Sequence, residues 1–80
     1  MSEISEAYAK AAKDGLVDGN VVRVQKLFRR WGINSFDDLK LWGQEDLLFI
    51  RGCGPTTLQR IMKFAAHYGI TIPPGEFRFR

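Results

Sequence analysis

Glycines and prolines stand between the periodic segments of this chain and divide it into short pieces. Helical spacing of apolar residues predicts five helices, over residues 3–13, 21–31, 36–42, 44–50 and 55–68. Gly15, Gly32 and Gly69 each follow one of these segments, at the position where many helices end. Pro55 suits the first position of the last helix. The sequence therefore predicts an all-α fold built from short helices.

The first two predicted helices differ in what they can bury. The helix over residues 3–13, which Ser2 can cap, has mostly alanine on its apolar side. It either packs on the body of the protein through Ile4 and Tyr8 or frays, because an isolated helix of this length is marginal in water. The next helix begins after Asn20, a predicted cap. Its apolar stripe has helical spacing and consists of Val24, Leu27, Phe28 and Trp31.

Charge along the chain alternates in blocks. The net charge is −2 over residues 1–20, +4 over 21–34, −3 over 35–50, +3 over 51–69 and +1 over 70–80. Arg23, Lys26 and Arg30 fall on one side of the second helix, away from its apolar stripe, and Arg29 extends that side. A fold that brings the two strongly positive blocks together would have a basic face, as expected of a polyanion binder. The alternative interpretation is an ordinary solvated surface.

Two short helices are predicted in the middle of the chain. Ser35 and Asp38 have the spacing of a capping box, and Asp37 suits the positive end of a helix. We therefore expect structural capping from these carboxylates rather than catalysis. The core residues expected from the two short helices are Leu39, Leu41, Trp42, Leu47, Leu48 and Ile50.

Residues 51–57 carry the most specific signal in the sequence. Gly52 and Gly54 flank Cys53 between two predicted helices, which indicates a tight turn. A backbone without Cβ atoms lets a ligand come close, and the free N–H groups at the start of the last helix suit a phosphate. Hydroxyl and basic side chains nearby add donors and charge. The predicted phosphate-binding residues are Arg51, Gly52, Gly54, Thr56, Thr57 and Lys63.

This segment resembles the helix-hairpin-helix motif of proteins that bind DNA without reading its sequence. The run from Leu47 to Leu58 carries the resemblance, as helix, Gly-x-Gly turn and helix. The resemblance implies contacts with backbone phosphates, which position a protein on a duplex but carry no sequence information. The alternative is a glycine turn between two core helices, as in protein-binding relatives of the same fold.

A wider stretch, residues 22–72, resembles the C-terminal domain of the bacterial RNA polymerase alpha subunit. The matching pieces align without a gap: Val22-Arg23, Leu27-Phe28, residues 32–39 and 45–51, Gly54, Leu58, Ile61 and residues 68–70. The resemblance implies a compact bundle of four or five helices in which the start of the first core helix lies beside the hairpin. It also implies contact with the DNA backbone and with A·T-rich minor grooves. Arg23 takes the position of the family's minor-groove arginine, and Lys26 lies one turn further on.

The chain departs from this family at several positions. Lys26 stands where the family usually has asparagine, Gly52 replaces another asparagine, and Pro55 and Thr56 replace two lysines. The polymerase assembly domain is lacking and a further N-terminal helix is present, so we expect a free-standing small protein or an excised module. The expected organisation is an N-terminal helix and linker over 1–19, the helical domain over 20–72 and an irregular tail over 73–80.

Residues that would carry other chemistry lack partners at suitable spacing. Cys53 is the only cysteine, which excludes an internal disulfide, and we expect it to plug the hairpin. His67 is expected on the surface, and the two tryptophans are expected to pack. No catalytic set, metal site or cofactor motif can be assembled, so the sequence predicts a non-enzymatic protein without cofactor or metal.

The expected partner is double-stranded DNA. The alternative function is a protein-interaction adaptor that docks on a polymerase, a regulator or a second copy through its N-terminal helix or its tail. In that tail, Phe77 and Phe79 alternate with Arg78 and Arg80, a strand-like pattern. A membrane span needs about 20 apolar residues, and none is present. The N-terminus lacks the pattern of a signal peptide, which predicts a cytoplasmic location.

Overall fold

Five helices follow one another in the part of the chain that the computed structural model describes, residues 2–17 and 20–76. They are α1 (Glu3–Lys13), α2 (Val21–Arg30), α3 (Phe36–Leu39), α4 (Gln44–Phe49) and α5 (Pro55–His67). No strand occurs in these residues, so the predicted all-α class is confirmed. The last four helices end one to three residues earlier than the sequence predicted.

The three longer helices end in the same motif. Gly15, Gly32 and Gly69 each adopt a positive φ, between 72° and 78°, two residues after the last residue of α1, α2 and α5. The amide of the following apolar residue then donates to the carbonyl five residues earlier, for example from Ile33 to Phe28 at 2.8 Å. Only glycine adopts this left-handed conformation without strain. The three predicted helix stops are therefore confirmed.

Side-chain hydrogen bonds fix three of the helix starts, and at α4 the Gly43 amide donates to Asp46 Oδ2 at 2.8 Å. The Ser2 hydroxyl accepts the amide of Ser5 at the start of α1. At α3, Asp38 and Ser35 form a reciprocal capping box, each accepting the other's amide at 3.1 Å. Both predicted caps are confirmed. Asn20 precedes α2 as expected, but its side chain makes no capping hydrogen bond.

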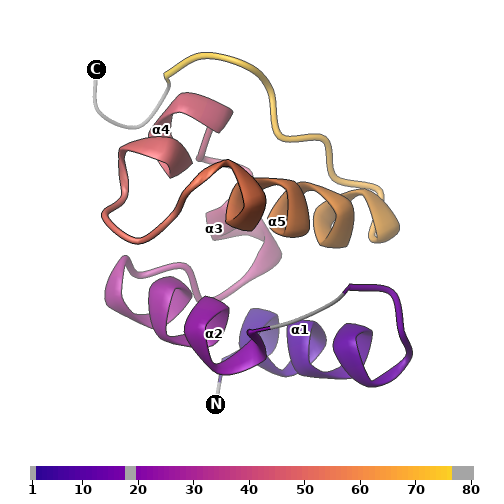
Figure 1. Cartoon of the computed structure of the whole chain (residues 1–80). Coiled ribbons are helices and arrows are strands. Elements are labelled where there is room, and N and C mark those ends of the chain that lie inside the picture. Colours follow the sequence, from indigo (N-terminus) through magenta and orange to yellow (C-terminus); the bar gives the residue numbers. More distant parts are fainter. Residues whose placement is uncertain (1, 18–19, 77–80) are drawn as a thin grey trace.

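The helices form two layers (Figure 1). Helices α1 and α2 pack side by side, and α5 lies across from them with α3 and α4 beside it. After α5 the chain runs back over α4. There the amides of Gln44 and Glu45 donate to the carbonyls of Pro73 and Gly75, at 2.8 and 3.1 Å. Residues 70–76 thus supply acceptors to the free amides at the start of α4.

Tyr8 connects the two layers. This side chain is fully buried, and its ring meets Phe28 of α2 at 6.1 Å and Phe64 of α5 at 4.9 Å, both edge to face. Ile4 is also fully buried, and its amide donates to the carbonyl of Asn34. Of the two outcomes expected for the N-terminal helix, packing through Ile4 and Tyr8 is therefore the one observed. Helix α1 shares one core with the other helices.

Three core predictions differ from the structure. Leu41 and Leu48 were expected to face inward, but they are 56% and 38% exposed. Phe64 of α5 is fully buried, although it was not among the predicted core residues. The leucines belong to a turn and a six-residue helix, which are too short for apolar periodicity to define a buried side. The neighbouring Leu39, Trp42, Leu47 and Ile50 are buried as predicted.

Candidate nucleic-acid interface

Helix α2 separates its apolar and cationic side chains. Val24, Leu27 and Phe28 are buried against the core. Burial of that stripe turns the other sides of the helix outward, because residues three and four apart share a face. The cations left exposed on α2 are Arg23, Lys26, Arg29 and Arg30. The predicted cationic side of this helix is therefore present, and no acidic residue belongs to the helix.

The glycine turn between α4 and α5 is held by a buried cysteine. Gly52 has φ +92°, a conformation that favours glycine, and Cys53 is only 4% exposed. The Cys53 amide donates to the carbonyl of Ile50 at 3.0 Å, which closes the turn. Burial raises the pKa of the Cys53 thiol above its ordinary value of 9.0, so the thiol stays protonated at neutral pH. The expected role of Cys53 as a plug is confirmed.

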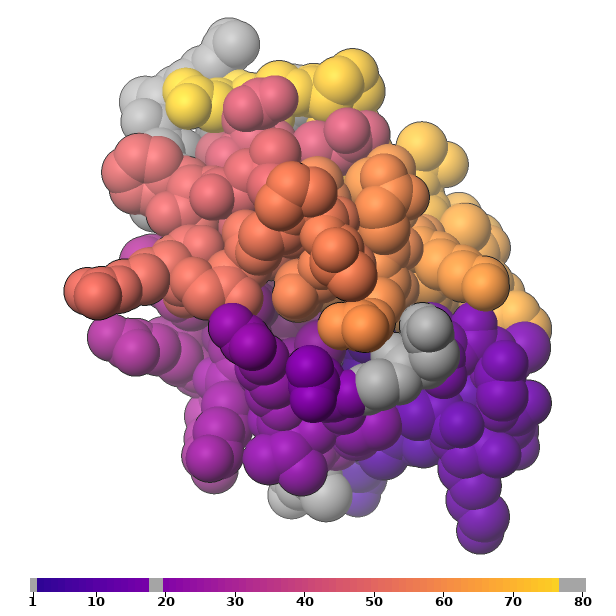
Figure 2. Space-filling model, in the orientation of Figure 1, coloured from indigo at the N-terminus to yellow at the C-terminus, as the bar shows by residue number. Residues whose placement is uncertain are grey.

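Arg23 connects α2 to this turn. Its Nη2 donates to the carbonyl oxygen of Gly52 at 3.3 Å, across 29 residues of sequence. The two segments border a groove of about 140 Å³, which we call the hairpin groove. It is lined by Arg23, Lys26, Leu27, Arg30, Trp31, Arg51 and Gly52. Figure 2 shows the turn before α5 projecting beside α2 at the left of the molecule.

The hairpin groove is strongly cationic. Four of its lining residues carry a positive charge and none is acidic. The Gly52 carbonyl would repel an approaching phosphate, but the Arg23 guanidinium already covers it and keeps other N–H donors available. Among the described residues the one salt bridge joins Lys40 to Asp37, outside this groove. Within residues 2–17 and 20–76, no acidic side chain forms an ion pair with a cation of the groove, so these cations can attract an anion.

The start of α5 exposes backbone donors beside the turn. Gly54 is the N-cap and offers no capping side chain, and the first hydrogen bond here runs from the Leu58 amide to the Gly54 carbonyl at 2.9 Å. The amides of Gly54 and Thr56 precede that bond, so they are left to solvent or a ligand. No atom lies within 4 Å of the position of a Cβ on Gly54. The backbone is therefore open to close approach at this point.

The other predicted site residues are not all at the groove. Thr56 and Lys63 are exposed and line a separate, wider depression on α5, of about 450 Å³. Thr57 is 8% exposed, which withdraws its hydroxyl from the surface. The groove thus brings together four of the predicted site residues, Arg23, Lys26, Arg51 and Gly52. Lys63 lies elsewhere on α5, and Thr57 belongs to the core.

Three groove residues were outside the predicted site: Leu27, which was predicted as a core residue, Arg30 and Trp31. Arg30 lies four residues after Lys26 and seven after Arg23, so helical spacing already indicates that it shares their side. Trp31 lines the same groove and is half-buried, with its ring edge to face against Trp42 at 6.1 Å. Trp42 is buried and Trp31 packs against it, as expected.

Across residues 2–17 and 20–76, no three His, Cys, Asp or Glu side chains form a group that could hold a metal ion. His67 lies exposed in the last turn of α5, as predicted. In the same ranges, every helix falls short of the length and apolar character required to cross a membrane. The aromatic and basic residues 77–80 lie outside the described residues.

Comparison with known proteins gives no family model that matches the chain, no matching curated protein and no matching solved structure. Function is therefore inferred from the residues of the site themselves.

Proposed function

We propose that this protein is a double-stranded DNA-binding module. The hairpin groove would bind backbone phosphates, and Arg23 would enter the adjacent minor groove. The proposal depends on one observation above all, the Arg23–Gly52 hydrogen bond, which joins cations from two distant segments around one groove without an acidic side chain. A cationic concavity that has free backbone donors beside it is suited to a polyanion.

The resemblance to the C-terminal domain of the polymerase alpha subunit supports the same proposal. It implies an arginine beside the hairpin, and Arg23 contacts Gly52 there. Narrow A·T-rich minor grooves have an enhanced negative potential that attracts arginine. The two lysines that the family has after the hairpin are Pro55 and Thr56 here, so we expect weak affinity with most of the charge supplied by α2. We further propose a role in transcription on this basis.

The test is a titration of A·T-rich and G·C-rich duplexes in low-salt buffer, followed by fluorescence anisotropy. We expect binding in the range of non-specific affinity, about 10⁻⁴ to 10⁻⁶ M. Arg23→Ala is expected to weaken it about tenfold, which corresponds to roughly 1.4 kcal/mol. Lys40→Ala removes an equal charge from an exposed residue outside the groove and should bind like the wild type. Absence of binding at about 0.1 mM protein, the weak end of that range, rejects the proposal.

A protein-interaction adaptor is the second candidate, and two side chains of α4 favour it. Leu48 and Phe49 are 38% and 69% exposed. The docking surface expected on the N-terminal helix has less support, because Ile4 and Tyr8 are buried in the core. Chemical shifts that move on α4 with RNA polymerase, and that do not move at the hairpin with a duplex, would favour the adaptor.

A further inference from the structure

A second and larger groove runs between α1 and α2. It has a volume of about 460 Å³, and we call it the α1–α2 crevice. No acidic side chain lines it. Its lining includes two cations and four polar side chains: Lys26, Arg29, Gln25, Asn34, Ser2 and Ser5.

The two grooves share one residue. Lys26 lines both the hairpin groove and the α1–α2 crevice. Arg23, Lys26 and Arg29 are spaced three residues apart, so they follow one another along α2. At 1.5 Å per residue, Arg23 and Arg29 are separated by about 9 Å of helix. Arg29 also lies about 120° around the helix from Arg23, at 3.6 residues per turn. Since a phosphate backbone flanks the minor groove on each side, a duplex that receives Arg23 in this groove can present one backbone to Lys26 and Arg29.

The walls of the crevice are fixed by hydrogen bonds between segments. The Gln25 side chain donates through Nε2 to the Ser5 carbonyl at 2.9 Å, which joins α2 to α1. The Ile4 amide donates to the Asn34 carbonyl at 3.2 Å, which joins α1 to the loop after α2. Lys26 and Arg29 are exposed, and neither forms an ion pair within the described residues. The crevice is therefore preformed, with two cations available to an anion.

We propose that the α1–α2 crevice binds a second phosphate-backbone segment of the duplex whose minor groove receives Arg23. This inference rests on the proposed function. It makes α1 part of the DNA-binding surface, because Ser2 and Ser5 form one wall of the α1–α2 crevice. The ligand class is the phosphodiester backbone. Arg29 supplies the charge specific to the crevice, Lys26 bridges the two grooves, and the amide of Asn34 adds hydrogen-bond donors.

Arg29→Ala tests the inference, with Lys13→Ala as the matched control. Lys13 is an exposed cation in the last turn of α1 and lines neither groove. In a salt titration with one duplex, we expect Arg29→Ala to weaken binding about threefold to tenfold and to reduce the slope of log K against log salt by about 0.9, the value for one lost phosphate contact. Lys13→Ala should keep the wild-type slope. A thermal melt of each variant confirms that it is folded.

The outcomes separate this inference from the proposed function. If Arg29→Ala binds like Lys13→Ala while Arg23→Ala is weakened, the crevice takes no part and only this inference fails. If the wild type binds no duplex, both fail. Polyglutamate serves as a competing probe in shift mapping. Chemical-shift changes of the Gln25 and Asn34 side-chain amides on addition of duplex support the inference. Shift changes with polyglutamate and none with duplex overturn it and indicate that the crevice binds an acidic peptide.

Discussion

Gly52 and Gly54 flank the same buried cysteine, yet their backbones differ. Gly52 has φ +92°, where a side chain is strained, and a Cβ there would lie 3.9 Å from Arg23 Nη2, an ordinary contact distance. Gly54 has φ −85° and ψ −178°, an extended conformation open to any residue, with no atom within 4 Å of a Cβ. The first glycine is therefore required by the turn. Gly54 is not required by the fold. We infer that the lack of a side chain there lets a ligand reach the backbone.

This difference predicts that an alanine substitution at Gly52 mainly lowers stability, whereas one at Gly54 mainly weakens binding. Gly52→Ala should destabilise the protein by about 1–2 kcal/mol, because a side chain is forced into the left-handed region. Gly54→Ala should cost less than about 1 kcal/mol, since it changes only a helix cap, but it should weaken duplex binding by blocking the backbone. Urea denaturation and anisotropy measure the two effects. If Gly54→Ala binds DNA like the wild type, the proposed phosphate contact with the Gly54 amide is wrong.

Thr57 shows where reasoning about single residues from sequence fails. As a hydroxyl beside the hairpin it suited a phosphate site, yet it is 8% exposed. Its place in the helix explains this result, because Thr57, Ile61 and Phe64 are four and three residues apart and share the buried side of α5. The hydroxyl of Thr57 suggested a phosphate site, but the helical spacing of Thr57 places its side chain on the buried side of α5. Burial of Cys53 was predicted correctly because a small apolar side chain between two glycines fills the inside of a tight turn.

Helix α1 makes its largest contact with the other helices through one aromatic side chain. Its apolar side is mostly alanine, which buries little area. Tyr8 supplies the large contact, meeting Phe28 and Phe64 from two other helices. Because α1 also forms one wall of the α1–α2 crevice, the position of this helix matters for binding as well as for stability.

Tyr8→Ala is therefore expected to be among the most destabilising single substitutions. Removing a fully buried aromatic ring costs about 3–5 kcal/mol, a large share of the stability of a small domain. Tyr68→Ala is the matched control, since Tyr68 is 41% exposed, and it should cost clearly less. Urea denaturation measures both. Equal losses in the two variants would show that α1 is only loosely attached to the body of the protein.

The helices themselves were largely predictable, and their boundaries came from local chemistry. The capping box of Ser35 and Asp38 and the left-handed Gly15, Gly32 and Gly69 act within a few residues of the helix ends they define. The inward side of the short segments was less predictable, because Leu41 and Leu48 are placed by packing between helices. The contact between Arg23 and Gly52 could be expected only from the family resemblance, since 29 residues separate them.

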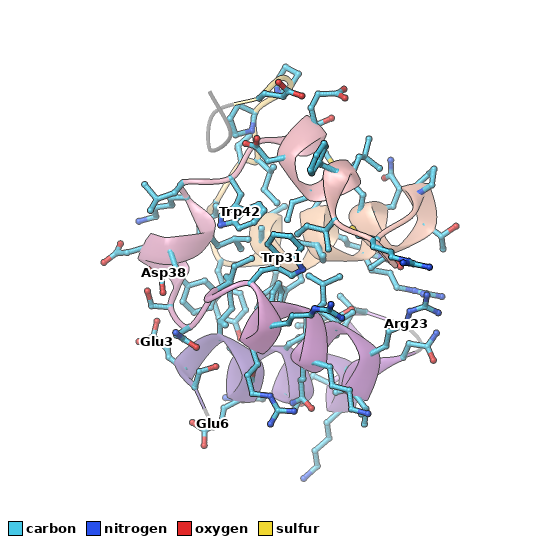
Figure 3. The ribbon with its side chains drawn as sticks, turned by 90° about the vertical axis from the view of Figure 1, so that its left-hand side faces the viewer. Glu3, Glu6, Arg23, Trp31, Asp38 and Trp42 are labelled. Carbon is cyan, nitrogen blue, oxygen red and sulfur yellow. The ribbon has the colours of Figure 1, made fainter. Side chains whose placement is uncertain are left out.

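Among the described residues, the cationic hairpin groove and the acidic starts of α1 and α3 lie on different sides of the molecule. Figure 3 shows Arg23 at one side and Glu3, Glu6 and Asp38 at the other. Acidic residues begin α1 and α3, whereas the cations of α2 and Arg51 surround the hairpin groove. The cations on the hairpin side attract the phosphates of a duplex. The carboxylates on the acidic side repel a duplex that approaches from there.

This arrangement predicts how binding responds to ionic strength. With Arg23 in the minor groove, contact of Lys26, Arg30 and Arg51 with phosphates gives a slope of log K against log salt of about −2.7, at roughly −0.9 for each contact. Participation of Arg29 would make the slope steeper by about one further contact. Anisotropy titrations between about 20 and 200 mM salt measure it. A slope near zero would contradict phosphate binding and favour the adaptor function.

The hydrogen bond between Arg23 and Gly52 has a thermodynamic consequence. The unfolded chain holds its cations on separate stretches, so the complete groove exists only in the native state. A ligand that recognises the groove must then oppose unfolding, by about 2.7 kcal/mol at a free concentration one hundred times its dissociation constant. Denaturation temperature is thus a second readout of occupancy, and any substitution that loosens the helices will also reduce apparent affinity without touching the ligand.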